Sequence, residues 1–235
     1  MLENWLEFAR GPLFRLALAL CVLGLARNVL LTVWAIGRTY LRAADKDLPF
    51  KAIAERTIRW IIPFRLSVKN RFFYSICSIL FHVGLILVPI FLFAHIRLWE
   101  AAIGIGWFAL PRTLADILTI VTVITGIILF MGRLGSSASR AISHFQDILW
   151  PPSLIVPFLS GFLCAHPSWC PINYHWMMLV HVLSAELILV FMPFTKIAHC
   201  VLFPFSQLIS DLGWRFPASS GRDVEITLGK QGQLT

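Results

Sequence analysis

Charged residues are scarce in this 235-residue chain: 14% are Asp, Glu, Lys or Arg, whereas 58% are hydrophobic. That composition predicts an integral membrane protein rather than a soluble domain. The sequence also lacks the patterns GxxxxGK(S/T), CxxC and CxxCH. We therefore expect no nucleotide-binding P-loop, no iron–sulfur site and no covalently attached haem. The formal net charge is +8, and we expect the excess of Lys and Arg to lie in cytoplasmic loops. No nucleic-acid partner is expected.

Five apolar segments are long enough to cross a bilayer. They cover residues 13–36, 72–99, 113–132, 148–165 and 175–203. The loops at 37–71 and 133–147 and the tail hold most of the Lys and Arg, and the positive-inside rule places these parts in the cytoplasm. The sequence therefore predicts an all-α, five-helix transmembrane bundle, multi-pass in a cell (inner) membrane, with the N-terminus outside and the C-terminus inside. Residues 1–204 form this membrane domain, and 205–235 form a short cytoplasmic tail.

The first basic loop contains a stretch with helical character. Residues 49–62 alternate apolar and basic side chains at roughly helical spacing. This pattern predicts an amphipathic helix that lies in the membrane interface or docks a cytoplasmic partner.

Two histidines, His181 and His199, bracket the apolar part of the fifth segment. In an uninterrupted α-helix this spacing is five turns, so both imidazoles would point to one side, about 27 Å apart. The hydrocarbon core of a bilayer is about 30 Å thick, which places one histidine near each leaflet. Imidazole is costly in lipid unless it is used, and haem iron takes neutral histidine as an axial ligand. The spacing therefore predicts two b-type haems, one near each leaflet.

The second segment supplies a partner for each of these histidines. It contains His82 and His95, and in the predicted topology it runs outward while the fifth segment runs back. Depth alone then pairs His82 with His199 at the inner side and His95 with His181 at the outer side.

The outer ligand has competitors in the sequence. Thirteen residues of ideal helix turn His82 and His95 about 140° apart, but Pro89 lies between them and is expected to kink the helix and restore the facing. His166 and His175 are rivals to His95 as the outer ligand, or residues that line a quinone pocket.

These histidine patterns also carry a resemblance. His181, Pro193-Phe194-Thr195-Lys196 and His199, together with Phe81-His82-x-Gly84, resemble the respiratory nitrate reductase gamma subunit family. That family is a five-helix dihaem cytochrome b that exchanges electrons with quinones. Its relatives include cytochrome b subunits of sulfite-reduction-associated, heterodisulfide-reductase-like and hydrogenase membrane complexes. The family usually places its second histidine ten residues after the first, where this chain has Leu92.

Three residues are candidates for holding the haem or the quinone. Arg27 is a partner for a haem propionate or a quinone oxygen, or else an arginine that reaches the interface. Gly84 removes a side chain and so allows close approach of the macrocycle. Lys196 pairs with an inner-haem propionate or extends to the cytoplasmic interface.

Two acids inside apolar segments are candidates for proton transfer. Glu186 lies deep in the fifth segment, where it handles protons or makes a hydrogen bond within the bundle. Asp116 accepts a quinol proton, or stabilises the N-terminus of its helix as a first-turn acid.

The sequence thus predicts a subunit that acts as quinol dehydrogenase or quinone reductase within a larger oxidoreductase. The resemblance implies a quinone site near the outer haem and an iron–sulfur or multihaem cytochrome c subunit as partner. A haem-free membrane anchor and a proton or metal transporter are the alternatives, and no internal repeat favours a transporter. Cys164 and Cys170 flank an external loop, where a disulfide is a further hypothesis.

Overall fold

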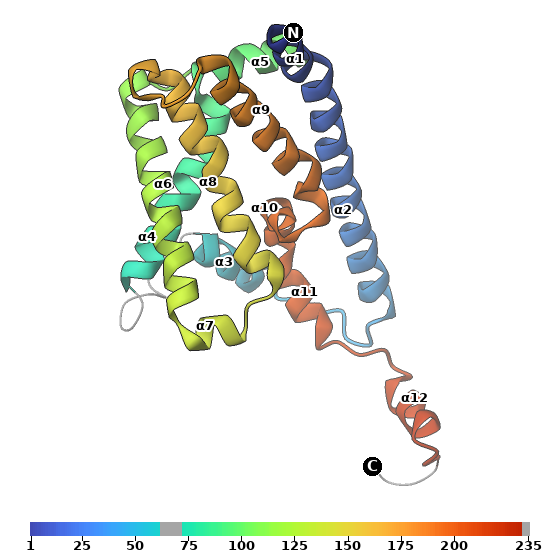
Figure 1. Cartoon of the computed structure of the whole chain (residues 1–235). Coiled ribbons are helices and arrows are strands. Elements are labelled where there is room, and N and C mark those ends of the chain that lie inside the picture. The colour runs from blue at the N-terminus through green and yellow to red at the C-terminus, as the bar shows by residue number, and fades with distance from the viewer. Residues whose placement is uncertain (62–71, 232–235) are drawn as a thin grey trace. The chain divides into compact units, whose positions relative to one another are not determined.

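The computed structural model describes residues 1–61 and 72–231, and within them it is helical with no β-strand (Figure 1). Five helices within these residues are long and apolar enough to cross a membrane, which confirms the predicted all-α class and the predicted number of spans. They are Leu2–Arg42, Phe72–Phe91, Arg112–Gly135, Phe145–Ala165 and Tyr174–Phe194. The chain divides into two compact units. Unit 1 is Met1–Val22 with Ser67–Lys196, and unit 2 is Leu23–Leu66 with Ile197–Thr235.

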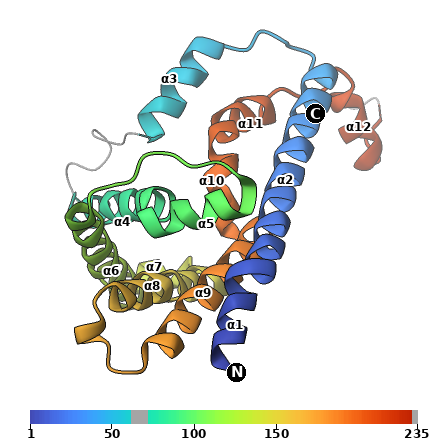
Figure 2. The same cartoon turned by 90° about the horizontal axis from the view of Figure 1, so that it is seen from above.

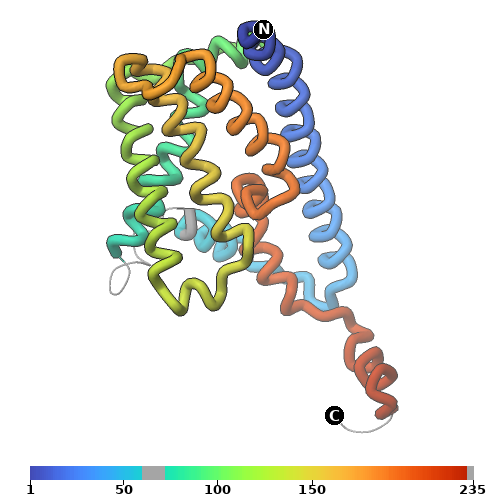
Figure 3. The backbone as a smooth tube through the Cα atoms, in the orientation of Figure 1, coloured from blue at the N-terminus to red at the C-terminus, as the bar shows by residue number. Residues whose placement is uncertain are grey.

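Four helices of unit 1 pack side by side in chain order: α4 (Phe72–Phe91), α6 (Arg112–Gly135), α8 (Phe145–Ala165) and α9 (Tyr174–Phe191). The backbone trace in Figure 3 follows this arrangement. On the buried face of α6, the small residues Thr119, Thr122, Thr125 and Gly126 allow close approach of neighbouring helices. Each threonine hydroxyl donates to the carbonyl four residues earlier, so no hydroxyl of this face is left unsatisfied.

The first helical segment adds to unit 1 at the side of α9. Helix α1 (Leu2–Phe8) and the π-helical turn η1 (Ala9–Leu13) both contact α9, and α2 (Phe14–Arg42) continues from there. Figure 2 shows α1 next to α9 in a second view. We call the end of unit 1 that carries α1, α5 and the α8–α9 connection the α5 end, and the opposite end, with α7 (Ser137–Ala141), the α7 end.

The second span is interrupted after its proline. Helix α4 contains Pro89 and ends at Phe91, and α5 (Phe93–Ile103) begins after Leu92. Leu92 has φ −72° and ψ 130°, an extended conformation that breaks the helix. Proline removes a backbone donor and clashes with the preceding turn, which accounts for a break at this place. The predicted distortion at Pro89 is therefore confirmed, and the span is two helices rather than one.

The fifth span is also interrupted, and here the sequence prediction is wrong. Helix α9 ends at Phe191, a 3₁₀ turn follows over Met192–Phe194, and Thr195 is extended with φ −129° and ψ 176°. Helix α10 (His199–Leu202) begins only after another short turn. The five-turn geometry that placed His181 and His199 on one face required a continuous helix. Pro193 interrupts the helix because, like Pro89 in the second span, it lacks a backbone donor and clashes with the preceding turn.

Unit 2 is built around α3 (Phe50–Ile61) and α11 (Ser206–Gly213), which pack together. Its core is a small apolar cluster of Leu48, Ile53 and Leu212, covered by Ile36, Tyr40 and Leu208. Arg56 on α3 forms an ion pair with Asp211 on α11. Helix α3 buries Ile53 and exposes Lys51 and Arg59, so the amphipathic helix predicted at 49–62 is present. Of the basic residues of that loop, Arg65, Lys69 and Arg71 lie outside the described residues.

Candidate functional site

The imidazole rings of His95 and His181 lie together at the α5 end of unit 1. Their ring centroids are 5.9 Å apart and their planes are parallel within 8°. His95 is in the first turn of α5 and His181 is in α9, and both are half-buried. The proximity predicted from depth is thereby confirmed. Because the backbone is extended at Leu92, the His95 side chain points in a different direction from the one it would have on a straight continuation of α4.

A backbone carbonyl holds each of the two rings. Nδ1 of His95 lies 3.1 Å from the carbonyl oxygen of Pro89, and Nδ1 of His181 lies 2.8 Å from that of Pro157. A carbonyl oxygen only accepts, so both Nδ1 atoms carry the proton and both Nε2 atoms carry the lone pair. Metal-binding histidines are held in this way, with the second ring nitrogen donating to a carbonyl. The tautomer of both rings therefore fits axial ligation through Nε2.

Gly161 on α8 provides the space for the His181 ring. A Cβ atom at Gly161 would lie 2.7 Å from Cε1 and 2.9 Å from Nδ1 of His181. Such contacts are too short for any side chain, so only glycine lets the ring lie against α8. Pro157 is one turn earlier on the same helix, and α8 thus both orients the ring and makes room for it.

The donor set fits a haem better than a structural metal ion. No group of three or more His, Cys, Asp or Glu side chains gathers within the described residues. A two-histidine set is what an iron porphyrin needs, because the macrocycle supplies the four remaining ligands. His95 and His181, whose ring centroids are 5.9 Å apart, are the residues that would hold such a group here.

The second predicted pair is not tested in this way. His82 lies on α4 of unit 1 and His199 begins α10 of unit 2, and both are exposed. Nδ1 of His82 lies 2.7 Å from the carbonyl oxygen of Ser78, which again assigns the proton to Nδ1. The pairing of His82 with His199 stays a prediction.

The rival histidines each have an acidic neighbour instead. Nε2 of His166 lies 3.4 Å from Oδ2 of Asp116, and Nε2 of His175 lies 3.8 Å from Oε1 of Glu3. The nitrogen that a haem iron would take is directed at a carboxylate in both cases. The geometry therefore favours His95 over His166 and His175 as the partner of His181.

Two of the three predicted cofactor-binding residues have other neighbours in the structure. Nζ of Lys196 lies 2.7 Å from Oδ2 of Asp147 on α8, so its charge has a protein partner and the propionate role gains no support. Gly84 lies against Thr122 of α6, whose Oγ1 would overlap a Cβ at this position. This glycine thus makes room for a neighbouring helix, and its predicted role beside a macrocycle stays a prediction. Arg27 is exposed on α2 in unit 2, and its predicted role stays a prediction.

The contact at Gly84 makes a testable prediction. Gly84→Ala is expected to destabilise the α4–α6 contact by about 1–3 kcal/mol, because the added methyl group overlaps Thr122 in a packed interface. Thermal unfolding in detergent measures the loss. The double variant with Thr122→Ala should be more stable than additivity of the two single variants predicts. Strict additivity would contradict this role for Gly84.

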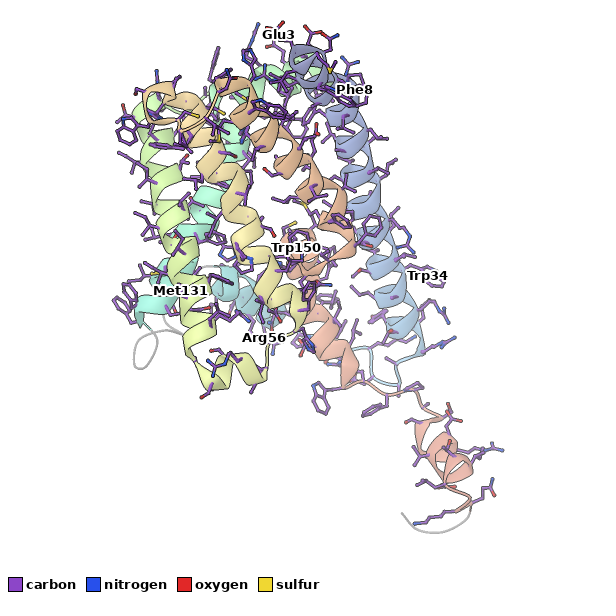
Figure 4. All side chains as sticks on the ribbon, viewed as in Figure 1. Glu3, Phe8, Trp34, Arg56, Met131 and Trp150 are labelled. Carbon is purple, nitrogen blue, oxygen red and sulfur yellow. The ribbon has the colours of Figure 1, made fainter. Side chains whose placement is uncertain are left out.

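Glu186 is buried in α9, with 5% of its surface exposed. Neither of its carboxylate oxygens has a hydrogen-bond partner among the described residues, and the indole nitrogen of Trp150 on α8 is in the same situation. In Figure 4, Glu3 lies at the α5 end and Trp150 lies far from it, toward the middle of unit 1. A buried carboxyl group without a partner costs free energy, so the predicted proton role of Glu186 is compatible with its surroundings.

Arg10 is a residue that the sequence analysis missed. It lies in η1, which contacts α9, the helix that carries His181. The signal was Pro12 within the first apolar run, since proline disturbs the helical ladder and π-helical turns are frequent at functional sites. The disulfide hypothesis is wrong in this structure, where Cys164 and Cys170 are free thiols.

Fold and site together define a helical protein with five membrane-length helices and a candidate two-histidine centre. No family model matches the sequence, and no solved structure matches it. A curated protein of Nitratidesulfovibrio vulgaris (strain Hildenborough) is 29% identical over 205 residues, which cover 85% of this chain and 89% of that protein. Its name is "Protein" and states no activity. The site must therefore be interpreted from its own chemistry.

Proposed function

We propose that this chain is a dihaem cytochrome b subunit of a respiratory complex in the cell (inner) membrane. It exchanges electrons between the quinone pool and a partner redox subunit that carries iron–sulfur clusters or multiple c-type haems. His95 and His181 would hold the outer haem, and His82 and His199 the inner one. Lipid surrounds the five long helices.

The observation that carries this proposal is the parallel pair of His95 and His181, with both Nδ1 protons donated to carbonyls. Two imidazoles brought together with their Nε2 lone pairs available are expensive to place inside a bundle without a metal. A bound haem would supply one-electron chemistry at this place. The chain's own contribution is to fix the two rings, through Pro89, Pro157 and Gly161, before the cofactor arrives.

The haem-free anchor and the transporter explain this geometry less well. An anchor has no use for two rings whose tautomer is fixed and whose positions are set by a glycine and two proline carbonyls. A transporter would use Glu186 as a proton group, but a path needs further polar partners, and Glu186 has no hydrogen-bond partner among the described residues. A cytochrome uses the histidine pair, which neither alternative does.

Reduction by a quinol tests the proposal. Membranes that contain the full chain are mixed with duroquinol, a soluble quinol, and the visible spectrum is followed. We expect the sharp absorption bands of reduced b-type haem to develop, and to develop further with dithionite, which reduces every haem. Bands that dithionite produces and duroquinol does not would contradict the quinol part of the proposal. No bands with either reductant would contradict all of it.

A further inference from the structure

Helix α3 in unit 2 has one side that the rest of the unit already covers. Ile53 packs in the apolar cluster with Leu48 and Leu212, and Arg56 forms its ion pair with Asp211 on α11. This side of α3 is therefore held by contacts within the chain. The other sides of the helix carry its exposed side chains.

A row of apolar side chains runs along one of these exposed sides. Phe50, Ala54 and Ile58 are spaced four residues apart, so they are neighbours on one strip of the helix surface. Phe50 is 63% exposed and Ile58 is 58% exposed. We call these three residues the Phe50–Ile58 stripe. Contiguous apolar side chains that stay exposed mark a surface that contacts a membrane or a partner.

Two cationic side chains flank this stripe. Lys51 directly follows Phe50 and Arg59 directly follows Ile58, so both lie on the same flank, about 100° further around the helix. Lys51 is exposed and has no ion pair among the described residues. Nη2 of Arg59 lies 3.7 Å from Oε2 of Glu55, and the arginine side chain is still 74% exposed. Apolar surface with positive charge along its edge is typical of helices that lie in a membrane interface.

The C-terminal part of α2, which belongs to the same unit, marks the depth of α3. The guanidinium carbon of Arg38 lies 4.6 Å from the centroid of the Trp34 ring, and both side chains are exposed. Figure 4 shows Trp34 projecting from α2. Tryptophan is enriched at membrane–water interfaces, where arginine also brings its charge to the headgroups. Ile36 and Tyr40, on the same stretch of α2, pack against the cluster that contains Ile53. Helix α3 is therefore attached to α2 at the level where that span reaches the interface.

Positive charge predominates at the end of α2 and along α3. Residues 38–59 contain six Lys or Arg and three Asp or Glu. Of these acids, Asp45 is paired with Arg215 and Glu55 lies beside Arg59, so little negative charge remains to oppose the cations. A basic cluster next to a membrane span attracts the headgroups of anionic lipids. A bilayer is always present beside the end of a span, and it matches both the apolar stripe and the charge at its edge.

We propose that the Phe50–Ile58 stripe lies in the membrane interface and that Lys51 and Arg59 bind the phosphate groups of anionic phospholipids. The stripe enters the boundary between headgroups and acyl chains, while the two long cationic side chains extend to the headgroups. The sequence predicts either interface placement or a cytoplasmic partner for this helix. The inference selects the interface and adds the class of lipid, and it depends on neither haem nor quinone.

Quenching by brominated lipids tests this placement in the full chain. Ile58 on the stripe and Ala52 on the opposite side of α3 are each replaced, in separate samples, by a fluorescent amino acid. Both samples are reconstituted in bilayers of phosphatidylcholine and phosphatidylglycerol, with bromine on the acyl chains of one lipid at a time. Bromine quenches a fluorophore that it contacts, so the dependence of quenching on lipid composition gives the relative association constant of the two lipids at that position.

We expect strong quenching at position 58 and weak quenching at position 52. Phosphatidylglycerol should be favoured over phosphatidylcholine at position 58 by about fivefold, which corresponds to the attraction of one basic side chain by an anionic surface. High salt should reduce this preference, because exposed charges are screened. The double variant Lys51→Glu/Arg59→Glu should abolish the preference.

Arg222→Glu/Lys230→Glu is the matched control. Both residues are exposed in or directly after α12 (Ser220–Thr227) of the same unit, and the double variant changes the net charge of the chain by the same amount. It should keep the preference for phosphatidylglycerol at position 58.

Three results would overturn the inference. Weak quenching at position 58 with both lipids would turn the stripe away from the membrane, as docking of a protein partner requires. Equal quenching by the two lipids in the parent chain would exclude the binding of anionic headgroups. Equal loss of the preference in both double variants would assign it to the net charge of the chain rather than to Lys51 and Arg59.

Discussion

Replacing His181 by alanine is expected to reduce the haem content of the purified chain from two b-type haems to one. The ring of His181 stands opposite that of His95 at 5.9 Å, and its position depends on a hydrogen bond to Pro157. Removing one of two axial ligands leaves the iron held on a single side. His95→Ala should have the same effect, because each ring is half of the same centre. Added imidazole should restore part of the lost haem in both variants by filling the vacated position.

His175→Ala is the matched control for this experiment. His175 lies on α9 like His181, but its Nε2 faces Glu3, and we expect two haems to remain. Retention of two haems in His95→Ala would contradict the assigned pair, and would return His166 or His175 as the outer ligand. Retention in His181→Ala would contradict a centre at this position altogether.

The second large effect is expected from a single methyl group on α8. In Gly161→Ala the new Cβ would lie 2.7 Å from Cε1 of His181, so the ring or the helix must move. Overpacking of this kind costs about 1–3 kcal/mol. The movement also separates Nδ1 of His181 from the carbonyl oxygen of Pro157, which lies 2.8 Å away. We therefore expect the outer haem to be lost or its absorption bands to shift, as measured in the reduced-minus-oxidised spectrum.

Gly126→Ala is the matched control. It distinguishes the effect of crowding anywhere in unit 1 from the effect of crowding the His181 ring. Its Cβ would lie 2.9 Å from Phe81 and 3.0 Å from Ile155, a clash of the same size in the same unit. It should lower the unfolding temperature in detergent but leave the outer haem bands unchanged. Gly135→Ala, with no atom within 4 Å of its Cβ, should change neither. Equal spectral changes in the variants at Gly161 and Gly126 would show that the role of Gly161 is not specific.

The class of fold could be predicted because membrane-spanning helices follow from the length and hydropathy of each segment alone. The proximity of His95 and His181 followed from the depth of each residue and from the effect of Pro89 on its helix. The first argument needs no knowledge of which helices touch, whereas the second also assumes that the second and fifth segments lie close together.

The missed features depend on contacts between distant residues or on local breaks. The prediction for the fifth segment requires a continuous helix from His181 to His199, whereas the chain is extended at Thr195 and His199 begins a separate helix. Lys196 meets Asp147, 49 residues earlier, and such a partner cannot be found from spacing. His166 and Asp116 were each considered as functional residues, but only the packing of α6 on α8 brings them together.

Gly84 shows how one residue type fits two explanations. A glycine two residues after a histidine in an apolar segment is compatible with a nearby macrocycle and with a close helix contact. The structure shows the helix contact with Thr122, and the role beside a macrocycle stays a prediction. Gly161, which the sequence analysis did not select, is the glycine that lies against a proposed iron ligand.

The most direct test is the number of haems per chain. The full chain is purified in detergent from cells that produce haem, its protein concentration is determined by amino-acid analysis, and its haem is extracted and measured as the pyridine complex. We predict two non-covalently bound b-type haems per chain. A purified, folded chain that contains no haem would contradict the account.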